Sequence, residues 1–503
     1  MDTSQPQAEK RRPSRQARPG ARSPGQVRAA ARGDPGGSPE RRPERGVDGV
    51  FSKILIANRG EIAVRIIRAC REMGISTVAV YSKADKDALH VTMADEAYCI
   101  GGAQVADSYL NMAAILEVAV VSGAQAIHPG YGLLSENAKF AALCKKCNIE
   151  FIGPSAEMID RLGDKDEARK TMRAAGVPVT PGSDVIDDID EAREKAKEIG
   201  FPLLVKARSG GGGRGIRRVD SLDEFDNAFL SAKAEAQSAF GDGAVYMEKF
   251  LFPVKHVEMQ LLSDKYGNVV CLGERECSVQ RKNQKLIEES PSPAITPEIR
   301  AKMMEAAAKA ARAVGYENAG TVEFLLDKDK NFYFMEMNTR LQVEHPVTEM
   351  VVGIDIVQWQ IRIASGAKLT VTQDRVFIHG NAIECRINAE DSEHNFRPSC
   401  GTINFIHVPG GPCVRFDTAI YQDYSIPPYY DSMIGKLIVQ ARSRELAIRK
   451  MKMALSELTI NGVKHNRDLH IDILSDPEFV SGEYTTGFME ERMARAEKDK
   501  NEE

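Results

Sequence analysis

Length, composition and charge limit what this chain can be. Its 503 residues are too many for one hydrophobic core and predict two to four packed domains. Apolar residues make up 43% of the chain, which argues against global disorder, and the net charge of −5 gives no reason to expect nucleic acid or an acidic membrane as the main partner. Because no apolar run approaches the ~20 residues that span a bilayer, and because nine scattered cysteines indicate a reducing compartment, we expect a cytoplasmic protein.

Residues 1–50 differ in composition from the rest of the chain. They contain eleven Lys or Arg, six Asp or Glu, seven Pro and seven Gly, with almost no large apolar side chains. Such a segment cannot bury enough surface to offset its ordering entropy, so we expect disorder. It lacks the apolar stretch of a secretory signal, and its acids and prolines fit poorly with a transit peptide, which favours a solvated or mis-assigned extension over an organellar address.

The folded part begins at Phe51 with an alternation of strand and helix. The sequence KILIAN predicts a buried strand, EIAVRIIRACREMG an amphipathic helix, and STVAVYS a second strand. This βαβ unit predicts a first α/β domain, residues 51–165. Its first strand-to-helix turn, NRGE, has one glycine, so we do not expect a dinucleotide site, which needs GxGxxG.

The rest of the folded chain mixes helices and strands without a visible repeat, which predicts α+β architecture. We expect a small α+β unit at 166–250, a larger one at 251–378, a last domain at 379–492 that mixes strands with a terminal helix, and a charged tail at 493–503.

A glycine-rich loop, SGGGGRGI (209–216), joins the predicted strands LLVKAR and IRRV. Glycines let a backbone approach phosphate oxygens closely and adopt positive φ angles. A P-loop would join a strand to a helix and carry GKS or GKT, so we predict instead a hairpin that closes over phosphates, with Lys206 at the end of the preceding strand. The alternative is a hairpin without a ligand, but four consecutive glycines are costly for a mere turn.

The strongest constellation lies in GTVEFLLDKDKNFYFMEMNTRLQVEHP (320–346). Two predicted strands flank a four-residue connection, 328–331, and Glu323 and Glu336 are equidistant from its midpoint. We therefore expect these two glutamates to be cross-strand partners, with Cβ atoms about 5 Å apart. Two carboxylates placed in this way repel each other unless a cation lies between them, which predicts nucleotide-bound divalent metal ions such as Mg²⁺.

The polar residues of the same segment follow a period of two. Side chains two residues apart share one face of a strand. If the segment stays extended, one face carries acid, amide, cation, amide and acid, namely Glu336, Asn338, Arg340, Gln342 and Glu344. A merely solvated edge could alternate in this way, but it would not need to match a glutamate across the hairpin.

Nine motifs between residues 51 and 490 are together highly specific. They are IANRGEIAVRIIRAC, AIHPGYGLLSEN, FIGPS, KARSGGGGRGI, MEKF, ECSVQRKNQK, EMNTRLQVEHPVTE, ECRINAED and PPYYDSMIGKL. In them the chain closely resembles the biotin carboxylase component of biotin-dependent carboxylases. The resemblance implies an ATP-grasp fold of class α/β and α+β: a Rossmann-like N-terminal domain, a mobile lid at 166–250, a catalytic ATP-grasp subdomain and a C-terminal biotin carboxylase domain.

The same resemblance implies the ligands: ATP, Mg²⁺ or Mn²⁺ at two sites, bicarbonate, and biotin carried on another protein. Nucleotide contacts are implied for Lys165, Lys206, Gly211, Gly212, Gly213, Glu248, Lys249, Leu251, His256 and Gln280. Metal ligands are implied at Glu323, Glu336 and Asn338, and bicarbonate contacts at Lys285, Arg340, Gln342 and Val343. Glu344 would be the base that deprotonates bicarbonate, and Arg386 would stabilise the biotin enolate.

Five other residues are better explained by structure than by chemistry. Cys144 and Cys147 form a CxxC, but nothing nearby completes four zinc ligands, so we predict ordinary helix residues. The MKM tripeptide around Lys452 mimics a biotin attachment site, but its apolar spacing is helical. We expect a structural or turn role for His128 and a helix-packing role for Trp359.

The resemblance implies the catalytic subunit of a multi-subunit carboxylase acting for acetyl-CoA or propionyl-CoA. Because no biotinyl or carboxyltransferase region follows, we expect a separate biotin carboxyl carrier protein and a separate carboxyltransferase subunit, and the resemblance suggests a homodimer. Asn283 stands where many bacterial relatives carry histidine, which bears on ATP affinity more than on reaction class.

Three alternatives remain open. A pyruvate carboxylase subunit shares this half-reaction, and another ATP-grasp ligase, such as a carbamoyl-phosphate or purine-pathway enzyme, shares the fold. RLQVEHP together with Lys285 and Arg386 favours the carboxylase over the other ligases. A catalytically inactive scaffold subunit could lose its acids and lysines freely, yet Lys206, Glu323, Glu336 and Glu344 are all present.

Overall fold

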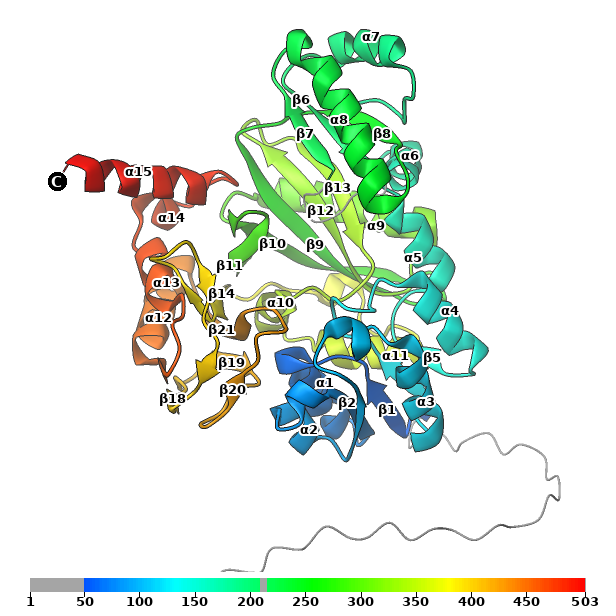
Figure 1. Ribbon diagram of the computed structural model, residues 1–503, viewed down its shortest axis with the longest axis vertical. Coiled ribbons are helices and arrows are strands. Elements are labelled where there is room, and N and C mark those ends of the chain that lie inside the picture. The colour runs from blue at the N-terminus through cyan, green and yellow to red at the C-terminus, as the bar shows by residue number, and fades with distance from the viewer. Residues whose placement is uncertain (1–48, 209–214, 503) are drawn as a thin grey trace, which may run out of the picture. The chain divides into compact units, whose positions relative to one another are not determined.

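The computed structural model describes residues 49–208 and 215–502 (Figure 1). The disorder predicted for residues 1–50 therefore falls almost wholly outside the described residues, and Gly211, Gly212 and Gly213 lie outside them. Within the described ranges, no helix combines the length and the apolar character that a membrane crossing requires.

The first domain is built on a parallel sheet with the strand order β3-β2-β1-β4-β5, as the βαβ pattern predicts. Ile62, Ile66 and Cys70, spaced four apart on the first helix, are buried against it. The strands are β1 (Lys53–Ile56), β2 (Ser76–Ser82), β3 (Glu96–Gly101), β4 (Ala126–His128) and β5 (Glu150–Phe151). The helices are α1 (Gly60–Glu72), α2 (Leu89–Met93), α3 (Met112–Ser122), α4 (Ala138–Lys146) and α5 (Ala156–Gly163), with short 3₁₀ turns η2 (Lys83–Asp85) and η3 (Val105–Asp107).

The region predicted as a lid has a three-stranded antiparallel sheet, in the order β7-β6-β8, and a hydrophobic core of its own. Phe225 and Phe229 of its long helix stack with ring centroids 5.6 Å apart and are buried with Val205 and Met247 of the sheet. The elements are α6 (Lys165–Ala174), α7 (Ile189–Ile199), β6 (Leu203–Ala207), β7 (Ile216–Val219), α8 (Leu222–Phe240) and β8 (Val245–Lys249). Because it has a separate hydrophobic core, this unit can keep its shape independently of the large sheet.

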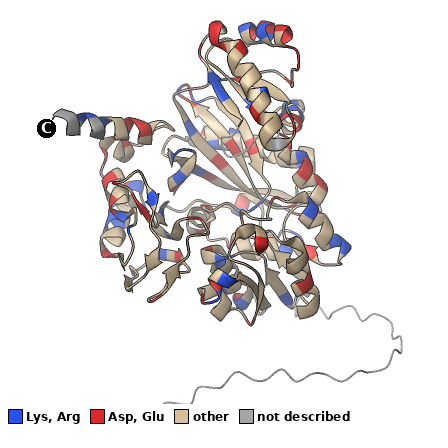
Figure 2. Ribbon diagram, in the orientation of Figure 1, with Lys and Arg blue, Asp and Glu red and all other residues tan. Residues whose placement is uncertain are grey.

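An eight-stranded antiparallel sheet, in the order β13-β12-β9-β10-β11-β14-β21-β19, forms the centre of the described chain. Strands from both sides of the boundary predicted at residue 378 pair in it, because β11 hydrogen-bonds to β14. The strands are β9 (Val254–Ser263), β10 (Val269–Arg281), β11 (Gln284–Ser290), β12 (Asn318–Asp327), β13 (Phe332–Asn338), β14 (Asn381–Asn388), β19 (Val414–Thr418) and β21 (Met433–Ala441). Figure 2 shows that charged residues lie on these strands as well as on the helices.

Helices cover the large sheet, and the C-terminal region adds short strand pairs. The helices are α9 (Pro297–Val314), α10 (His345–Val352), α11 (Ile356–Ala364), η4 (Gln373–Arg375), α12 (Arg444–Glu457), α13 (Arg467–Ile473), α14 (Pro477–Ser481) and α15 (Phe488–Glu502). The small strands are β15 (Glu390–Asp391), β16 (Arg397–Pro398), β17 (Gly401–Thr402), β18 (Phe405–His407), β20 (Ser425–Ile426) and β22 (Thr459–Asn461). The residues predicted as a charged tail continue α15, whose last described residue is Glu502.

The residues for which we predicted structural roles occupy structural positions. Cys144 is buried in α4 and Cys147 directly follows that helix. Lys452 lies inside α12, next to the buried Met451, and not on a hairpin tip. His128 is buried at the end of β4, where its Nδ1 accepts a hydrogen bond of 3.1 Å from the backbone N–H of Gly130.

Candidate active site

The two glutamates of the hairpin face each other as predicted. The connection between β12 and β13 is the four residues 328–331, and Glu323 pairs with Glu336. Next to the turn the register is offset by one residue, since Leu326 pairs with Phe332. An irregularity between Glu323 and Phe324 restores the predicted pairing, so a bulge in β13 is what brings the two acids opposite each other.

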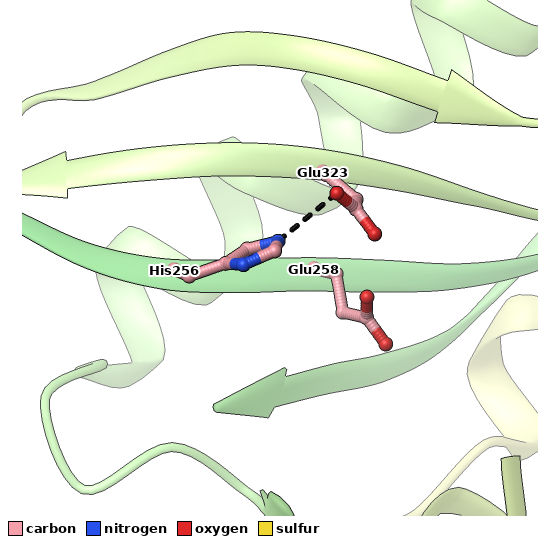
Figure 3. Close-up of side chains that lie close together, drawn as sticks. All are labelled: His256, Glu258 and Glu323. Carbon is pink, nitrogen blue, oxygen red and sulfur yellow. Dashed lines mark hydrogen bonds and ion pairs between the residues drawn. The ribbon is translucent and has the colours of Figure 1, made fainter. Parts of the chain in front are cut away.

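Positive and hydrogen-bonding side chains surround these two carboxylates. Lys165 Nζ lies 2.7 Å from Glu336, Lys285 Nζ lies 3.2 Å from Glu323, and His256 Nε2 lies 3.0 Å from the other oxygen of Glu323 (Figure 3). Burial alone would raise the pKa of Glu323, but the Lys285 and His256 cations outweigh it and hold the pKa well below its usual range. Glu323 is therefore ionised at neutral pH.

The donor set on the hairpin fits a hard divalent cation. Glu323 and Glu336 offer carboxylate oxygens from facing positions, and Asn338 adds an amide oxygen two residues further along the same strand. Among the residues that the structure describes, Asn338 Nδ2 is buried without a hydrogen-bond partner, and its Oδ1 accepts only a long bond of 3.3 Å from Arg340. This amide is thus free to direct its oxygen toward a cation.

The segment after Glu336 does not stay extended, which corrects our assumption. β13 ends at Asn338, and residues 339–344 form bends and a turn before α10. Leu341 is fully buried in the core shared by α1, α11 and the large sheet, and this anchor shapes the turn. The polar side chains meet nonetheless: Arg340 donates to Gln342 Oε1 (2.6 Å), and Gln342 donates to Glu323 (2.8 Å).

Glu344 ends this segment as a buried carboxylate between two cations. Lys285 Nζ lies 2.5 Å from one oxygen and Arg386 Nη2 lies 3.0 Å from the other, while the Glu344 side chain is only 1% exposed. Burial favours the neutral acid, but Lys285 and Arg386 reverse this and hold the pKa of Glu344 well below its usual range. Glu344 is therefore ionised at neutral pH, the form in which a carboxylate can accept a proton.

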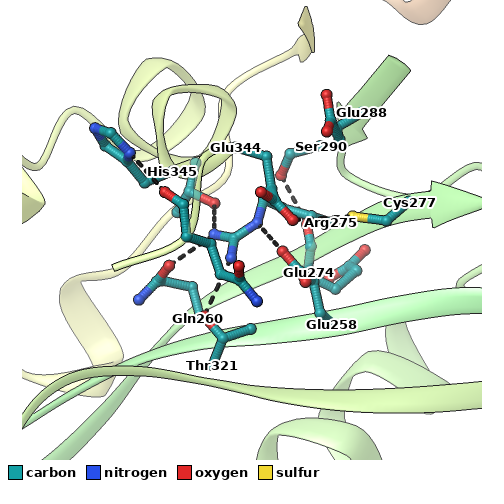
Figure 4. A network of polar contacts seen from close by, with 12 residues as sticks. Glu258, Gln260, Glu274, Arg275, Cys277, Glu288, Ser290, Thr321, Glu344 and His345 are labelled. Carbon is teal, nitrogen blue, oxygen red and sulfur yellow. Dashed lines mark hydrogen bonds and ion pairs between the residues drawn. The ribbon is translucent and has the colours of Figure 1, made fainter. Parts of the chain in front are cut away.

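Several residues of this cluster were missed by the sequence analysis. Glu258 contacts both Lys285 (2.8 Å) and the fully buried Arg275 (2.5 Å), which also bonds Gln260, Thr321 and Thr348 (Figure 4). Glu288 binds Arg386 at 2.5 Å. A signal was present, since charged residues inside otherwise apolar strands are expected only where partners exist.

The residues implied for nucleotide binding are partly grouped. Lys206 Nζ lies 2.5 Å from Glu248 across β6 and β8, and the Glu248 charge also acts on Lys165. Lys249 instead donates to the backbone carbonyls of Gly200 and Phe201, at 3.1 and 2.9 Å. The structure thus joins Lys206 and Glu248 directly, while Lys165 pairs with Glu336.

Two other implied nucleotide contacts lie beside or at the end of a strand. Leu251 is half-buried just after β8, and Gln280 is half-buried opposite Lys285 in the β10–β11 hairpin. Asn283 lies in the tight turn of that hairpin with φ +63°, a left-handed conformation that asparagine tolerates well. The positive φ angle of this turn thus gives a structural reason for an asparagine at position 283.

Comparison with known families covers almost the whole described chain. Residues 50–159 match the biotin carboxylase N-terminal domain, residues 164–372 the ATP-binding domain of the carbamoyl-phosphate synthase L chain, and residues 384–491 the biotin carboxylase C-terminal domain. The fold and this combination of domains are those of an ATP-grasp protein, an ATP-dependent ligase.

Individual relatives show which ATP-grasp family the chain resembles. The chain is 56% identical to a biotin carboxylase of Nostoc over 442 residues, which cover 88% of this chain and 99% of the relative. It is 53% identical to a pyruvate carboxylase subunit of Methanothermobacter thermautotrophicus, with 88% and 90% covered. The chain belongs to the biotin carboxylase family.

A solved structure of the family shows the same fold with ligands bound. It is the biotin carboxylase domain dimer of the Hydrogenobacter thermophilus 2-oxoglutarate carboxylase, in complex with MgADP, ADP and bicarbonate. It superposes with a TM-score of 0.84 at 51% identity and covers 88% of this chain and 98% of its own.

Proposed function

We propose that this chain performs the first half-reaction of an acyl-CoA carboxylase, the ATP- and bicarbonate-dependent carboxylation of biotin on a separate carrier protein. The observation that carries the proposal is the buried Glu344 carboxylate held between Lys285 and Arg386. A base beside two permanent cations suits a reaction in which one anion must lose a proton and another must be stabilised.

Bicarbonate is the first substrate in this scheme. Lys285, Arg340 and Gln342, with the backbone of Val343, hold it beside Glu344, and the guanidinium of Arg340 is fixed by Glu136 at 2.9 Å. Glu344 takes the hydroxyl proton, and the freed oxygen attacks the γ-phosphorus while the bond from that phosphorus to ADP breaks. The product, carboxyphosphate, divides into CO₂ and phosphate in a site that excludes water.

Biotin is the second substrate. The phosphate released from carboxyphosphate takes the proton of the biotin ring nitrogen. Arg386, which Glu288 and Glu344 hold in place, stabilises the enolate oxygen that results while the nitrogen bonds to CO₂. A guanidinium suits this role because it does not lose its proton at neutral pH.

ATP lies in this proposal between the lid and the β12–β13 hairpin. Lys165 and Lys206 contact the phosphates with Gly211, Gly212 and Gly213, while Glu248, Lys249, Leu251, His256 and Gln280 contact the nucleotide. Glu323, Glu336 and Asn338 would hold Mg²⁺ or Mn²⁺, which supplies charge neutralisation for the phosphates. The MgADP and bicarbonate in the Hydrogenobacter structure support this arrangement.

The assembly and the acyl acceptor complete the proposal. We propose a homodimer that works with a biotin carboxyl carrier protein and a carboxyltransferase subunit, because the Hydrogenobacter biotin carboxylase domain is a dimer. The reconstitution below decides the acceptor, because subunits of pyruvate and 2-oxoglutarate carboxylases are 53% and 52% identical to this chain and a biotin carboxylase of Haemophilus influenzae is 51% identical. Nine free thiols among the described residues support a cytoplasmic location.

The proposal is tested by measuring ATP hydrolysis by the full chain. Hydrolysis should require bicarbonate and divalent metal and should rise when free biotin is added. Turnover only with ammonia or glutamine would indicate another ATP-grasp ligase, and no turnover would indicate a scaffold subunit. Reconstitution with candidate carrier and transferase subunits, supplied with acetyl-CoA, propionyl-CoA, pyruvate or 2-oxoglutarate, then identifies the acceptor.

A further inference from the structure

A lysine lies fully buried in the middle of β21. Lys436 is 0% exposed, and the strand around it, MIGKLIVQA, is otherwise almost wholly apolar. Burial of an ammonium group costs several kcal/mol unless a charged partner and hydrogen bonds compensate. The chemistry proposed above does not use this side chain, so its position requires another explanation.

The ammonium group of Lys436 joins three distant segments. Its Nζ lies 3.0 Å from Oε1 of Glu61, in the first turn of α1, and donates a hydrogen bond of 2.9 Å to the carbonyl oxygen of Val343. Oε1 of Glu61 also accepts a hydrogen bond from the Tyr131 hydroxyl. The ammonium group of Lys436, on a C-terminal strand, therefore contacts both the first domain and the segment before α10.

The strand register places Lys436 beside a residue of the proposed active site. Lys436 lies directly opposite Arg386 in the β14–β21 pair, so the two side chains project from the same face of the sheet. Arg386 binds the carboxylate of Glu344, and Lys436 binds the carbonyl of Val343. Two neighbouring cations thus hold two consecutive residues of the site.

We infer that Lys436 is a positioning residue for the base, with Glu61 as its counter-ion. Its hydrogen bond fixes the peptide group that links Val343 to Glu344, and it thereby sets where the Glu344 carboxylate lies relative to bicarbonate. This inference rests on the proposed function. A displacement of about 1 Å at a reacting group can cost about 100-fold in rate, so a fixed peptide group matters here.

The test is the variant Lys436→Met in the full chain. Methionine has a similar length but offers neither charge nor donor. We expect kcat for biotin-stimulated ATP hydrolysis to fall at least about tenfold and the KM for bicarbonate to rise. Direct binding of a fluorescent ADP analogue should stay within about twofold of wild type, because none of the nucleotide contacts proposed above lies on β21.

Glu61→Gln is the second variant, in case Lys436→Met does not fold. Glutamine keeps the size and one acceptor oxygen for Tyr131 but removes the counter-charge of Lys436. We expect a smaller change in the same direction, about threefold in kcat and in the KM for bicarbonate, with nucleotide binding unchanged.

Lys255→Met is the matched control. Lys255 is also buried in a strand (7% exposed), lies 3.9 Å from the buried Glu276, and donates to the backbone carbonyls of Gly482 and Tyr484. It neighbours His256 in β9 and so projects from the opposite face of the strand. It should lower thermal stability without changing the KM for bicarbonate.

Unchanged kinetics in Lys436→Met and Glu61→Gln would overturn the inference. Equal losses of nucleotide affinity and kcat would also overturn it, because they would indicate a purely structural role. A wild-type chain without bicarbonate-dependent, biotin-stimulated ATP hydrolysis would instead reject the proposed function itself.

Discussion

Glu323 and Glu336 lie directly opposite each other across β12 and β13 because a bulge in β13 corrects the register set by the turn. Without that extra residue, Glu323 would face Met335, and the two carboxylates would point to different sides of the hairpin. The proposed metal site therefore depends on a single irregular residue.

The first prediction concerns metal binding at this pair. Glu336→Gln should raise the Mn²⁺ dissociation constant at least about tenfold, because it removes one charged oxygen ligand. Water-proton relaxation with Mn²⁺ measures the affinity independently of activity. Asp329→Asn, an exposed acid in the turn of the same hairpin, is the control and should bind Mn²⁺ like wild type. Equal affinities in all three proteins would contradict the assignment.

The second prediction concerns the base. Glu344→Gln should lower biotin-stimulated ATP hydrolysis by about 10²- to 10⁴-fold, because an amide cannot take the bicarbonate proton. Glutamine keeps the size of the side chain, so binding of MgADP, measured by calorimetry, should be unchanged. Activity within a few-fold of wild type would show that another group removes the proton.

The third prediction concerns the guanidinium proposed to stabilise biotin. Arg386→Met should abolish the stimulation of ATP hydrolysis by biotin while a slow bicarbonate-dependent hydrolysis remains, because carboxyphosphate can still form and decay. Steady-state phosphate release with and without free biotin separates the two activities. If biotin stimulates the variant as it does wild type, Arg386 does not act on biotin.

The fourth prediction concerns the stability of the buried network in Figure 4. Arg275 is 0% exposed and neutralises Glu258. Arg275→Met should lower the free energy of unfolding by about 3–5 kcal/mol, because it removes one of the two cations beside the buried Glu258 carboxylate and leaves Gln260, Thr321 and Thr348 without their donor. Urea denaturation measures the loss. Arg217→Met, which breaks an exposed pair with Glu235, should cost at most about 1 kcal/mol.

The fifth prediction concerns pH. Burial, followed by the nearby Arg65 charge, lowers the pKa of His128 to about 3, whereas an unfolded histidine titrates near 6.5. Below pH 6.5 the imidazole of His128 is protonated in the unfolded chain but stays neutral in the folded chain. The stabilisation that comes from the neutral His128 is therefore complete above pH 6.5 and is lost as the pH falls toward 3.

His128→Asn tests that pH dependence, because the Asn Oδ1 can replace Nδ1 as acceptor for the Gly130 N–H. Between pH 7 and pH 5 the wild type should lose about 2 kcal/mol more stability than the variant. Urea midpoints at the two pH values measure the difference. Parallel losses in both proteins would mean that His128 is already protonated in the folded state.

The sequence by itself determined the local elements and much of the candidate site. Periodicity predicted the βαβ start and the helix that contains Lys452, and symmetry about residues 328–331 predicted that Glu323 faces Glu336. The strand and helix elements depend on neighbours in the chain, whose spacing sets which side chains share a face. The pairing of Glu323 with Glu336 also needs the bulge in β13, which the symmetry argument did not predict.

Only the tertiary structure decided the partners that come from distant segments. Glu258, Arg275, Glu288 and Lys436 reach the site through the pairing of β9, β10, β11, β14 and β21, and no spacing in the sequence encodes which strands become neighbours. The turn after Asn338 is likewise set by the burial of Leu341 in a core built from separate parts of the chain. Long-range packing determines these contacts between buried charges, since a buried charge is stable only where the fold supplies its counter-charge.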